Sequence, residues 1–522
     1  MTTDWTEGYV ADHTYEHYYF PALAPNYIRA CLLLSGLDLP LRKPGEPMRY
    51  LELGYGQGFS LNLHAATDQE AEFWGTDFLP EQTLSAREIA LRAGLGTHLL
   101  NDSFAEFDEK AKAGMLPLFD IIVLHGIWSW INRENHEHIL NIIRTSLKPG
   151  GAVYISYNSM PGRVSSMPLR ELMTIHSDRK GAGKDSVTRA TEAAALIYAL
   201  VEGESTYFSY SPASRTLVEH MKTQSPVYLA HEYLNRNWHA SYFFEIAKNM
   251  ASAGCRFVTA ANILESALIA QPEKTRSFLN AVSDPVSWEA LKDFNQNTGF
   301  RRDIFVKDPV SLAPDEWRER LDSSYWSLGA PLTQTDSLSA VLPFATFNLD
   351  KSVYDPLLEV LAEDSLAPKS LAFLRTHPRL VHFEYDDFIS CIRMLFGCSF
   401  IYPAQPSSSA KTLSACRSLN SILCDLTAKG NLQDTLASPV LARGFGVSEH
   451  FQLFLRSYMA GIKDPVKWTE DAFSIMSAQG KTLRTKTSQD DQEGLVVFLQ
   501  EARRFEKDIL PFMKTIGIAP DQ

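Results

Sequence analysis

A glycine-rich turn between an apolar segment and a helical segment constrains the fold of this chain more than any other feature. The stretch YLELGYGQGFSLNLHA spans residues 50–65 and places Glu52, Gly54, Gly56 and Gly58 at every second position. Glycine lets the backbone adopt left-handed conformations and approach a ligand closely at the carboxyl edge of a parallel sheet. The sequence therefore predicts a strand, a ligand-binding turn and a helix here.

Further strand-like segments follow, with room for helices between them. Helical patterns cover residues 80–94 and 132–147, and Asn132 is the expected N-cap of the second. Strands that alternate with helices predict a parallel sheet covered by helices on both faces. The expected strands of the first part of the chain are residues 48–54, 71–77, 97–102, 118–126 and 152–158.

The alternation breaks after residue 162. Residues 163–223 contain helical patterns and a polar linker, and strand-like signals return at residues 225–235 and 255–261 with a helix between them. We interpret this region as the end of the same sheet, displaced by a helical insertion. Residues 308–522 carry mostly helical patterns.

Length, charge and cysteine usage narrow the class of protein. A chain of 522 residues exceeds one ordinary core, so about two to four domains are expected. The net charge of −13 argues against broad electrostatic binding to nucleic acid or to an anionic membrane. The six cysteines form no CxxC pair, and no apolar run reaches the length of a membrane span. We therefore expect a cytoplasmic protein with no nucleic-acid partner and no membrane insertion.

Histidine pairs give only a weak signal for a metal. His13 and His17 are four residues apart, and His231 and His239 flank another polar segment. Neither pair has a supporting third ligand, so we expect no metal site.

Acidic residues end the first three predicted strands. Asp77 is placed to accept hydrogen bonds from ribose hydroxyls, and Asp102 from an adenine amino group, although each acid could instead cap a turn or a helix. The glycine turn lacks the Lys-Ser/Thr pair of a phosphate-binding loop, so a ligand without phosphates, such as S-adenosylmethionine, fits best. The predicted cofactor-binding residues are Glu52, Gly54, Tyr55, Gly56, Gly58, Asp77, Phe78, Asp102, Ser103, Phe104 and His125.

Longer blocks of the sequence resemble a known family. FDIIVLHGIWSW, LKPGGAVYISYNSMPG, AHEYLNRNWHASYFFEIAKNMASAGCRFVTAANI and DFNQNTGFRRDIFVK are similar to blocks of class I S-adenosylmethionine-dependent methyltransferases that carry a methyltransferase regulatory domain. With a further block near the start, the resemblance spans roughly residues 8–307. The sequence departs from the family pattern at Tyr55, where a small residue is usual, and at Arg163, where tryptophan is usual.

The resemblance implies an architecture. The expected fold is α/β, a Rossmann-like class I methyltransferase sheet with a helical insertion, followed by mostly helical middle and C-terminal domains. Rickettsial-type outer-membrane protein lysine methyltransferases are bacterial members with a similar layout and length. The expected domains are residues 1–162, the first part of the methyltransferase core; 163–223, a helical insertion that either mediates dimerisation or caps the acceptor groove; 224–307, the end of the core and the regulatory region; 308–410, a winged-helix-like middle domain; and 411–522, a C-terminal helical domain.

Methyl transfer mainly requires alignment of the acceptor with the methyl–sulfur bond and exclusion of water. An amine acceptor must be neutral, which burial in an apolar, aromatic channel favours, so no dedicated base is needed. Each candidate also has a structural alternative, such as core packing for the tryptophans and tyrosines. The predicted catalytic residues are His125, Trp128, Trp130, Tyr157, Asn158, Tyr18 and Tyr19, the last two as part of an N-terminal lid.

Three functions remain open from the sequence. The first is a methyltransferase that acts on a protein acceptor, with lysine side chains as the best candidates and a homodimer as the expected assembly. The second is a methyltransferase for a glycan or a small metabolite, and the third is a non-catalytic binding module with a methyltransferase fold. Arg301, Arg302 and Lys307 form a basic patch that we interpret as a solvated turn, or as a contact with an acidic acceptor or another domain.

Overall fold

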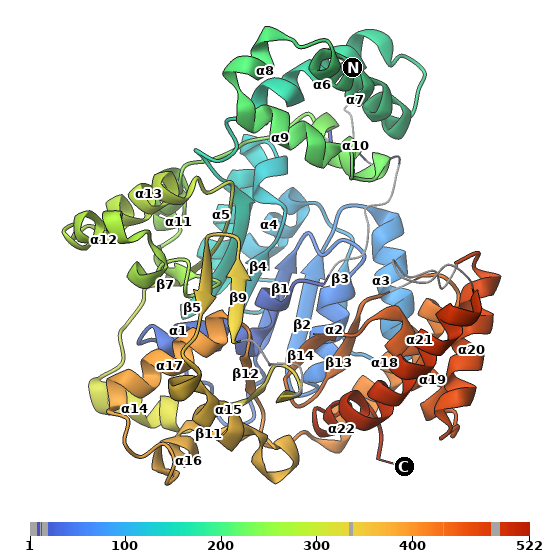
Figure 1. Ribbon diagram of the computed structural model, residues 1–522. Helices are drawn as coiled ribbons and strands as arrows, with labels where there is room; N and C mark the ends of the chain where they lie inside the picture. The colour runs from blue at the N-terminus through green and yellow to red at the C-terminus, as the bar shows by residue number, and fades with distance from the viewer. Residues whose placement is uncertain are drawn as a thin grey trace.

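The computed structural model describes residues 8–10, 12, 19–332, 338–431, 433–481 and 491–521. Its centre is a seven-stranded sheet in the order β3-β2-β1-β4-β5-β7-β6 (Figure 1). The predicted α/β fold with a Rossmann-like sheet is confirmed. The strands are β1 (Arg49–Leu53), β2 (Glu72–Thr76), β3 (His98–Leu100), β4 (Phe119–Leu124), β5 (Leu147–Asn158), β6 (Cys255–Ala260) and β7 (Phe300–Lys307).

Alternation of apolar side chains along the strands explains why the sheet is covered on both faces. Tyr50, Ile121 and Tyr154 belong to one hydrophobic cluster, whereas their chain neighbours Leu51 and Ile122 belong to another. Successive side chains of a strand point to opposite faces, so each strand contributes to both clusters. The helices around the sheet are α1 (Pro25–Leu34), α2 (Phe59–Thr67), α3 (Pro80–Ala93), α4 (Phe104–Lys112), α5 (Arg133–Ser146), α11 (Phe243–Ser252), α12 (Glu273–Asn280) and α13 (Pro285–Gln296).

One helix boundary illustrates how the sequence sets these elements. Helix α5 begins at Arg133 because the side chain of Asn132 accepts a hydrogen bond from the backbone N–H of Asn135. This bond satisfies one of the donors left free at a helix start. The predicted N-cap is therefore confirmed.

The sheet is mixed rather than parallel, which corrects the sequence prediction. Strand β7 pairs antiparallel with β5 on one side and with β6 on the other. The turn after α13, where Asn297 adopts a left-handed conformation, sends β7 back between two strands of opposite direction. Helix–strand alternation predicts parallel neighbours only while each crossover returns the chain to the same end of the sheet.

The predicted basic patch is also corrected, since it is strand β7 and one of its arginines is buried. The side chain of Arg301 is 1% exposed and donates to Asp293 (2.7 Å), Glu289 (2.8 Å) and Asp303 (2.9 Å). Its guanidinium also lies over the ring of Phe243. A buried arginine needs such partners, and a linear charge pattern does not reveal them.

A helical insertion follows β5 and lies above the sheet in Figure 1. It has a hydrophobic cluster of its own, which includes Met173, Ala194, Phe208 and Leu229. Its helices are α6 (Met167–Lys180), α7 (Ser186–Glu202), α8 (Thr206–Tyr210), α9 (Pro212–Met221) and α10 (Pro226–Leu234).

Helix α10 corrects the strand expected at residues 225–235. The Ser225 side chain accepts a hydrogen bond from the backbone of Tyr228, and Pro226 occupies the first helical turn. Buried Leu229, Ala230 and Tyr233 then recur at helical spacing. The serine cap and the proline outweigh the aromatic and valine content that suggested a strand.

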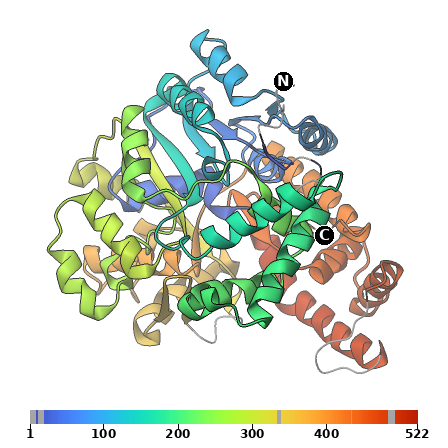
Figure 2. The same cartoon turned by 90° about the horizontal axis from the view of Figure 1, so that it is seen from above.

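The second half of the chain packs against the first. Figure 2, viewed from above, shows the C-terminal helices in orange to red on one side and the yellow-green helices α11–α13 on the other. Helix α18 packs on α2 and α3, and the Cys416 thiol donates to the Ala66 carbonyl. The helices are α14 (Pro314–Asp322), α15 (Lys351–Leu366), α16 (Leu371–Thr376), α17 (Tyr385–Gly397), α18 (Ala410–Ala428), α19 (Glu449–Met459), α20 (Pro465–Ala478), α21 (Asp491–Arg504) and α22 (Leu510–Thr515).

In the described part of the chain, three small antiparallel sheets accompany these helices. β8 (Tyr325–Leu328) lies between β11 (Lys369–Ser370) and β12 (Ile401–Ala404), β9 (Ser339–Leu342) pairs with β10 (Ala345–Asn348), and β13 (Thr435–Ser438) pairs with β14 (Arg443–Gly446). Among the described residues, no helix has both the length and the apolar character that crossing a membrane requires.

Candidate active site

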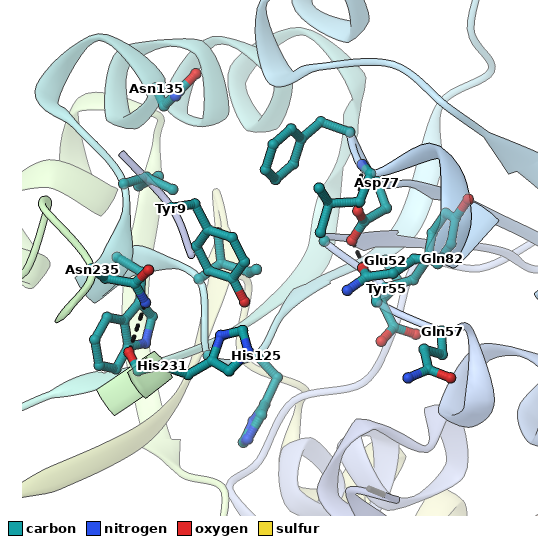
Figure 3. Close-up of a pocket in the computed structure, with 18 of the residues that line it drawn as sticks. Tyr9, Glu52, Tyr55, Gln57, Asp77, Gln82, His125, Asn135, His231 and Asn235 are labelled. Atoms are coloured by element: carbon teal, nitrogen blue, oxygen red, sulfur yellow. Dashed lines mark hydrogen bonds between the residues drawn. The ribbon is translucent and has the colours of Figure 1, made fainter. Parts of the chain in front are cut away.

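A cavity of about 560 Å³ lies where the carboxyl ends of the central strands meet the helical insertion. Figure 3 shows two opposing walls, with Glu52, Tyr55, Asp77 and Gln82 on one side and His231 and Asn235 on the other. The first wall comes from the turns after β1, β2 and β3, and the second mainly from α10 and the segments around it. We call these the strand-end wall and the α10 wall.

The glycine turn of the strand-end wall needs its glycines for two reasons. Gly54 and Gly56 have φ values of +73° and +58°, and both line the cavity. A Cβ atom on Gly54 would lie 2.3 Å from Ile127 Cδ1, so no larger side chain fits without displacing Ile127. Gly58 does not line the cavity; it begins α2 and packs on Ala86, where a Cβ atom would come within 2.5 Å.

Asp77 connects the ends of two strands. Its Oδ2 accepts a hydrogen bond from the backbone N–H of Gly56 (2.9 Å), and its Oδ1 accepts one from Leu79 (3.0 Å). This second bond closes a turn before α3 and does not cap the helix, because Leu79 occupies the N-cap position and no side chain accepts a capping hydrogen bond there. The same carboxylate also lines the cavity and fixes the glycine turn.

Asp102 and its neighbours form the far edge of the strand-end wall. Asp102 accepts from Lys110 Nζ (2.6 Å), and Ser103 caps α4 through a reciprocal pair of hydrogen bonds with Glu106. Asp102, Ser103 and Phe104 all line the cavity, as does Phe78 from the turn after β2. This edge therefore combines a carboxylate with two aromatic rings.

Two carboxyl groups of this wall are desolvated. Burial, helped by the nearby charge of Asp77, raises the pKa of Glu52 to about 8, and burial raises the pKa of Asp77 to about 6. Glu52 is 5% exposed, and its Oε2 has no hydrogen-bond partner among the described residues. An unpartnered buried carboxylate oxygen at a cavity surface is suited to a cationic ligand group.

Two parts of the chain match described protein families. Residues 15–193 match the family described as a methyltransferase domain, and residues 225–307 match a predicted methyltransferase regulatory domain. A protein of Synechocystis sp., sll1526, is 30% identical over 520 residues, which cover 99% of this chain and 100% of that protein. The chain belongs to the methyltransferases that carry this regulatory domain. It is an enzyme that depends on S-adenosylmethionine.

Other proteins share parts or all of this layout. RP789 of Rickettsia prowazekii is 26% identical over 312 residues, which cover 58% of this chain and 55% of that protein. The structure of PKMT2 from Rickettsia typhi, solved in complex with AdoHcy, superposes with a TM-score of 0.67 at 20% identity. That alignment covers 94% of this methyltransferase and 98% of PKMT2, so the two chains share their fold over nearly the full length.

The strand-end wall fits the methyl donor of this family. The unpartnered Oε2 of Glu52 suits the cationic amino group of the donor. The glycines allow the amino-acid end of the donor to approach the backbone. Of the residues that the sequence predicts for cofactor binding, only Gly58 lies away from the cavity. It shapes the turn by its close packing on Ala86.

His125 lines the cavity of the methyltransferase as a neutral residue. Its Nδ1 lies 2.9 Å from the hydroxyl of Tyr154, and the centroid of its ring lies 3.7 Å from that of Phe20, with the two rings tilted by 31°. Burial and the nearby charge of Arg302 lower its pKa to about 3. A histidine with this pKa is a weak base at neutral pH, so its position favours contact with a ligand over proton abstraction.

The two tryptophans predicted as catalytic lie in different surroundings. Trp128 is 1% exposed and stacks on His136 at 4.1 Å, away from the cavity. Trp130, two residues later in the same short 3-10 helix, lines the cavity.

The side chains of Tyr157 and Asn158 also lie in different surroundings, because consecutive side chains of a strand point to opposite faces of the sheet. The Tyr157 hydroxyl donates to Asp303 Oδ2 (2.6 Å) inside the protein, whereas Asn158 lines the cavity. The placement of Tyr157 and Trp128 supports the packing alternative for both side chains.

Only one of the two tyrosines predicted for an N-terminal lid lies in the described part of the chain. Tyr18 lies outside the described residues, and Tyr19 accepts a hydrogen bond from the backbone of Gly444 (2.8 Å) without lining the cavity. Tyr9 does line it, with its ring 6.0 Å from Phe78 and 5.8 Å from His231.

Residues 8–10 are held against the insertion on either side of Tyr9. The Gly8 carbonyl accepts from the backbone of Arg236 (2.9 Å), and the backbone of Val10 donates to Asn235 Oδ1 (2.7 Å). These bonds place the phenol between the two walls (Figure 3).

Sequence reasoning missed most of the α10 wall. The missed residues are Tyr228, His231, Glu232 and Asn235, which we expected on a strand of the sheet, whereas the resemblance had already placed Arg163, from the segment after β5, on the acceptor side. The serine–proline start of α10 was a usable signal for a helix. Nothing in the linear sequence shows that this helix faces the glycine turn.

Proposed function

We propose that this methyltransferase transfers a methyl group to lysine side chains of a protein acceptor. The observation that carries the proposal is that the strand-end wall and the α10 wall share one continuous cavity. A slender, flexible side chain from a protein surface can enter such a cavity and reach the donor without the rest of the acceptor. The large helical regions around the core also suit a macromolecular acceptor better than a small metabolite.

Under this proposal the strand-end wall holds the donor, S-adenosylmethionine, which supplies an activated methyl group when bound. Asp77 accepts from the ribose hydroxyls, Asp102 contacts the adenine side, and Glu52 faces the amino group. Phe78 and Phe104 flank the adenine. The glycine turn excludes water from the amino-acid end.

The acceptor lysine lies among aromatic and amide groups that line the cavity after β4 and at the ends of β5 and β7. Trp130 and Phe300 offer ring faces that suit a cationic or methylated amine, and Asn158 offers a hydrogen-bonding group beside them. Burial in such surroundings lowers the pKa of an amine and favours its neutral, nucleophilic form.

We propose a homodimer formed through the helical insertion. Leu196 and Leu200 lie one turn apart on α7 and are each 36% exposed, and Tyr210 is 87% exposed. Apolar exposure of this kind suits burial against a second copy. A monomer in size-exclusion chromatography with light scattering at micromolar protein concentration would rule this out.

We propose that the protein works in the cytoplasm. All six cysteines are free and buried, which suits a reducing compartment.

The acceptor is tested with isotopically methyl-labelled S-adenosylmethionine and a heat-treated cell extract whose own methyltransferases are inactive. We expect label in the protein fraction, and methylated lysine in its acid hydrolysate. The Asp77→Ala variant serves as a control that should give no label. Label recovered only in glycans or small molecules would contradict the protein acceptor, and equal label from both proteins would place the donor elsewhere.

A further inference from the structure

A partly buried ion pair lies in the α10 wall, opposite the residues that would hold the donor. Arg163 Nη1 lies 3.1 Å from Glu232 Oε1, and the two side chains are 24% and 14% exposed. Arg163 is also fixed by a hydrogen bond from its Nε to the Gly299 carbonyl (3.0 Å). Both residues line the cavity.

The ion pair spans two separate parts of the fold. Glu232 lies on α10, and Arg163 lies in the segment between β5 and α6. A pair that only joined these elements would not need to line a ligand cavity. A carboxylate has about four acceptor sites on two oxygens, and the contact with Arg163 is made to Oε1.

Two arginines and two tyrosines surround the carboxyl group of Glu232. Arg163 and Arg170, from α6, favour its ionised form, and the phenols of Tyr228 and Tyr233 lie near it on its own helix. Burial is the largest influence and raises the pKa of this carboxyl above its usual range. A ligand cation that reached the carboxylate would offset part of this desolvation.

We propose that Glu232, held in place by Arg163, binds the amine of the acceptor and selects amines over neutral groups of the same size. The inference rests on the proposed function, because it concerns the acceptor half of the same cavity. It deepens that function by assigning acceptor recognition to the one carboxylate among the described cavity residues that lies on α10.

The pair also provides a route for one proton. The acceptor arrives as an ammonium ion and gives one proton to the Glu232 carboxylate, which leaves a neutral amine beside a neutral carboxyl group. The carboxyl group then releases that proton to water. The fixed cation of Arg163 disfavours a second positive charge close by and also favours the ionised form of Glu232, so the proton passes on to water and does not stay on the carboxyl group.

The test uses the full-length protein saturated with AdoHcy and two small probes, n-butylamine and n-butanol. Butylamine reproduces the end of a lysine side chain, and butanol has the same length without the charge. Their dissociation constants are measured by NMR titration near neutral pH. We expect the wild type to bind the amine about tenfold more tightly, which corresponds to one charge-assisted hydrogen bond.

Variants separate recognition from folding. Glu232→Gln should bind the two probes equally while its melting temperature and AdoHcy affinity stay near those of the wild type. Glu232→Asp, which keeps a shorter carboxylate, should recover part of the preference for the amine. Glu219→Gln, on the exposed surface of α9 and paired with Lys222, is the matched control and should behave as the wild type.

Equal binding of both probes to the wild type would overturn the inference even if every variant failed to fold. A full preference for the amine in Glu232→Gln would overturn it as well. These outcomes are independent of the labelling experiment, in which the absence of methylated lysine would contradict the proposed function instead. If the wild type methylates lysine and Glu232→Gln does so with an unchanged kcat/KM, only the inference about Glu232 fails.

Discussion

The two walls of the cavity are built in different ways. The strand-end wall comes mainly from three consecutive strand–turn–helix units, whose side chains are fixed by bonds within those turns, as between Asp77 and Gly56. The α10 wall joins residues 8–10, the segment after β5, and α10, which are far apart in the sequence. A wall made of local units is set by short-range geometry, whereas the other depends on packing between distant segments.

The largest effect expected on this comparison is that of Asp77→Ala. The variant loses an acceptor for the donor and also the bond that fixes Gly56, so affinity for S-adenosylhomocysteine should fall about a hundredfold. Isothermal titration beside the wild type measures this loss. Affinity within a factor of about three of the wild type would show that the strand-end wall does not hold the ligand.

A second prediction concerns the desolvated Glu52. The pKa of Glu52 is about 8 in the folded protein and 4.5 in the absence of burial. Between pH 4.5 and pH 8 the folded protein therefore binds one proton that the unfolded chain has lost. The ligand-free wild type should therefore lose stability as the pH rises from about 4.5 to 8. Glu52→Gln carries no such charge and should be more stable by about 1–3 kcal/mol at pH 9, with little difference at pH 4.

Thermal unfolding of ligand-free protein across this pH range measures the effect of Glu52. Glu46→Gln, at a surface carboxylate that is paired with Lys148, provides the comparison. An identical pH slope in the wild type and in Glu52→Gln would show that Glu52 is not desolvated in the free protein.

A third prediction compares Trp128, which is buried, with Trp130, which lines the cavity in the same 3-10 helix. Trp128→Phe should lower the free energy of unfolding by about 1–3 kcal/mol, because it removes packed volume from a buried site. Trp130→Phe should change stability by less than about 0.5 kcal/mol and act instead on transfer to the acceptor. Chemical denaturation and a methyl-transfer assay of both variants separate the two roles, and equal destabilisation would contradict the assignment.

The smallest effect is expected at Tyr9, which bridges the two walls. Removing its ring in Tyr9→Ala should weaken S-adenosylhomocysteine binding about fivefold, because the edge contact with Phe78 is lost. Tyr9→Phe keeps the ring and should bind nearly as the wild type does. If both variants bind like the wild type, residues 8–10 do not contribute to the donor site.

Sequence reasoning predicted the positions of the first five strands along the chain, the N-cap of α5 and most residues of the strand-end wall. These features follow from short patterns, such as an apolar strand that ends in glycine and an acid at the next strand end. Sequence reasoning wrongly predicted a strand where α10 lies and a parallel direction for β7. Aromatic and β-branched residues occur in both strands and buried helices, and the direction of a strand depends on where the chain has travelled beforehand.

The sequence by itself determined a class I methyltransferase core with a glycine turn, because spacing within a few tens of residues defines each strand–turn–helix unit. Only the tertiary structure decided which residues face that turn. It placed Tyr9 and Glu232 in the cavity, and it placed Tyr157 and Arg301 inside the protein. The reason is physical: the direction of a side chain depends on packing between elements that the sequence leaves far apart, and local patterns carry no record of that packing.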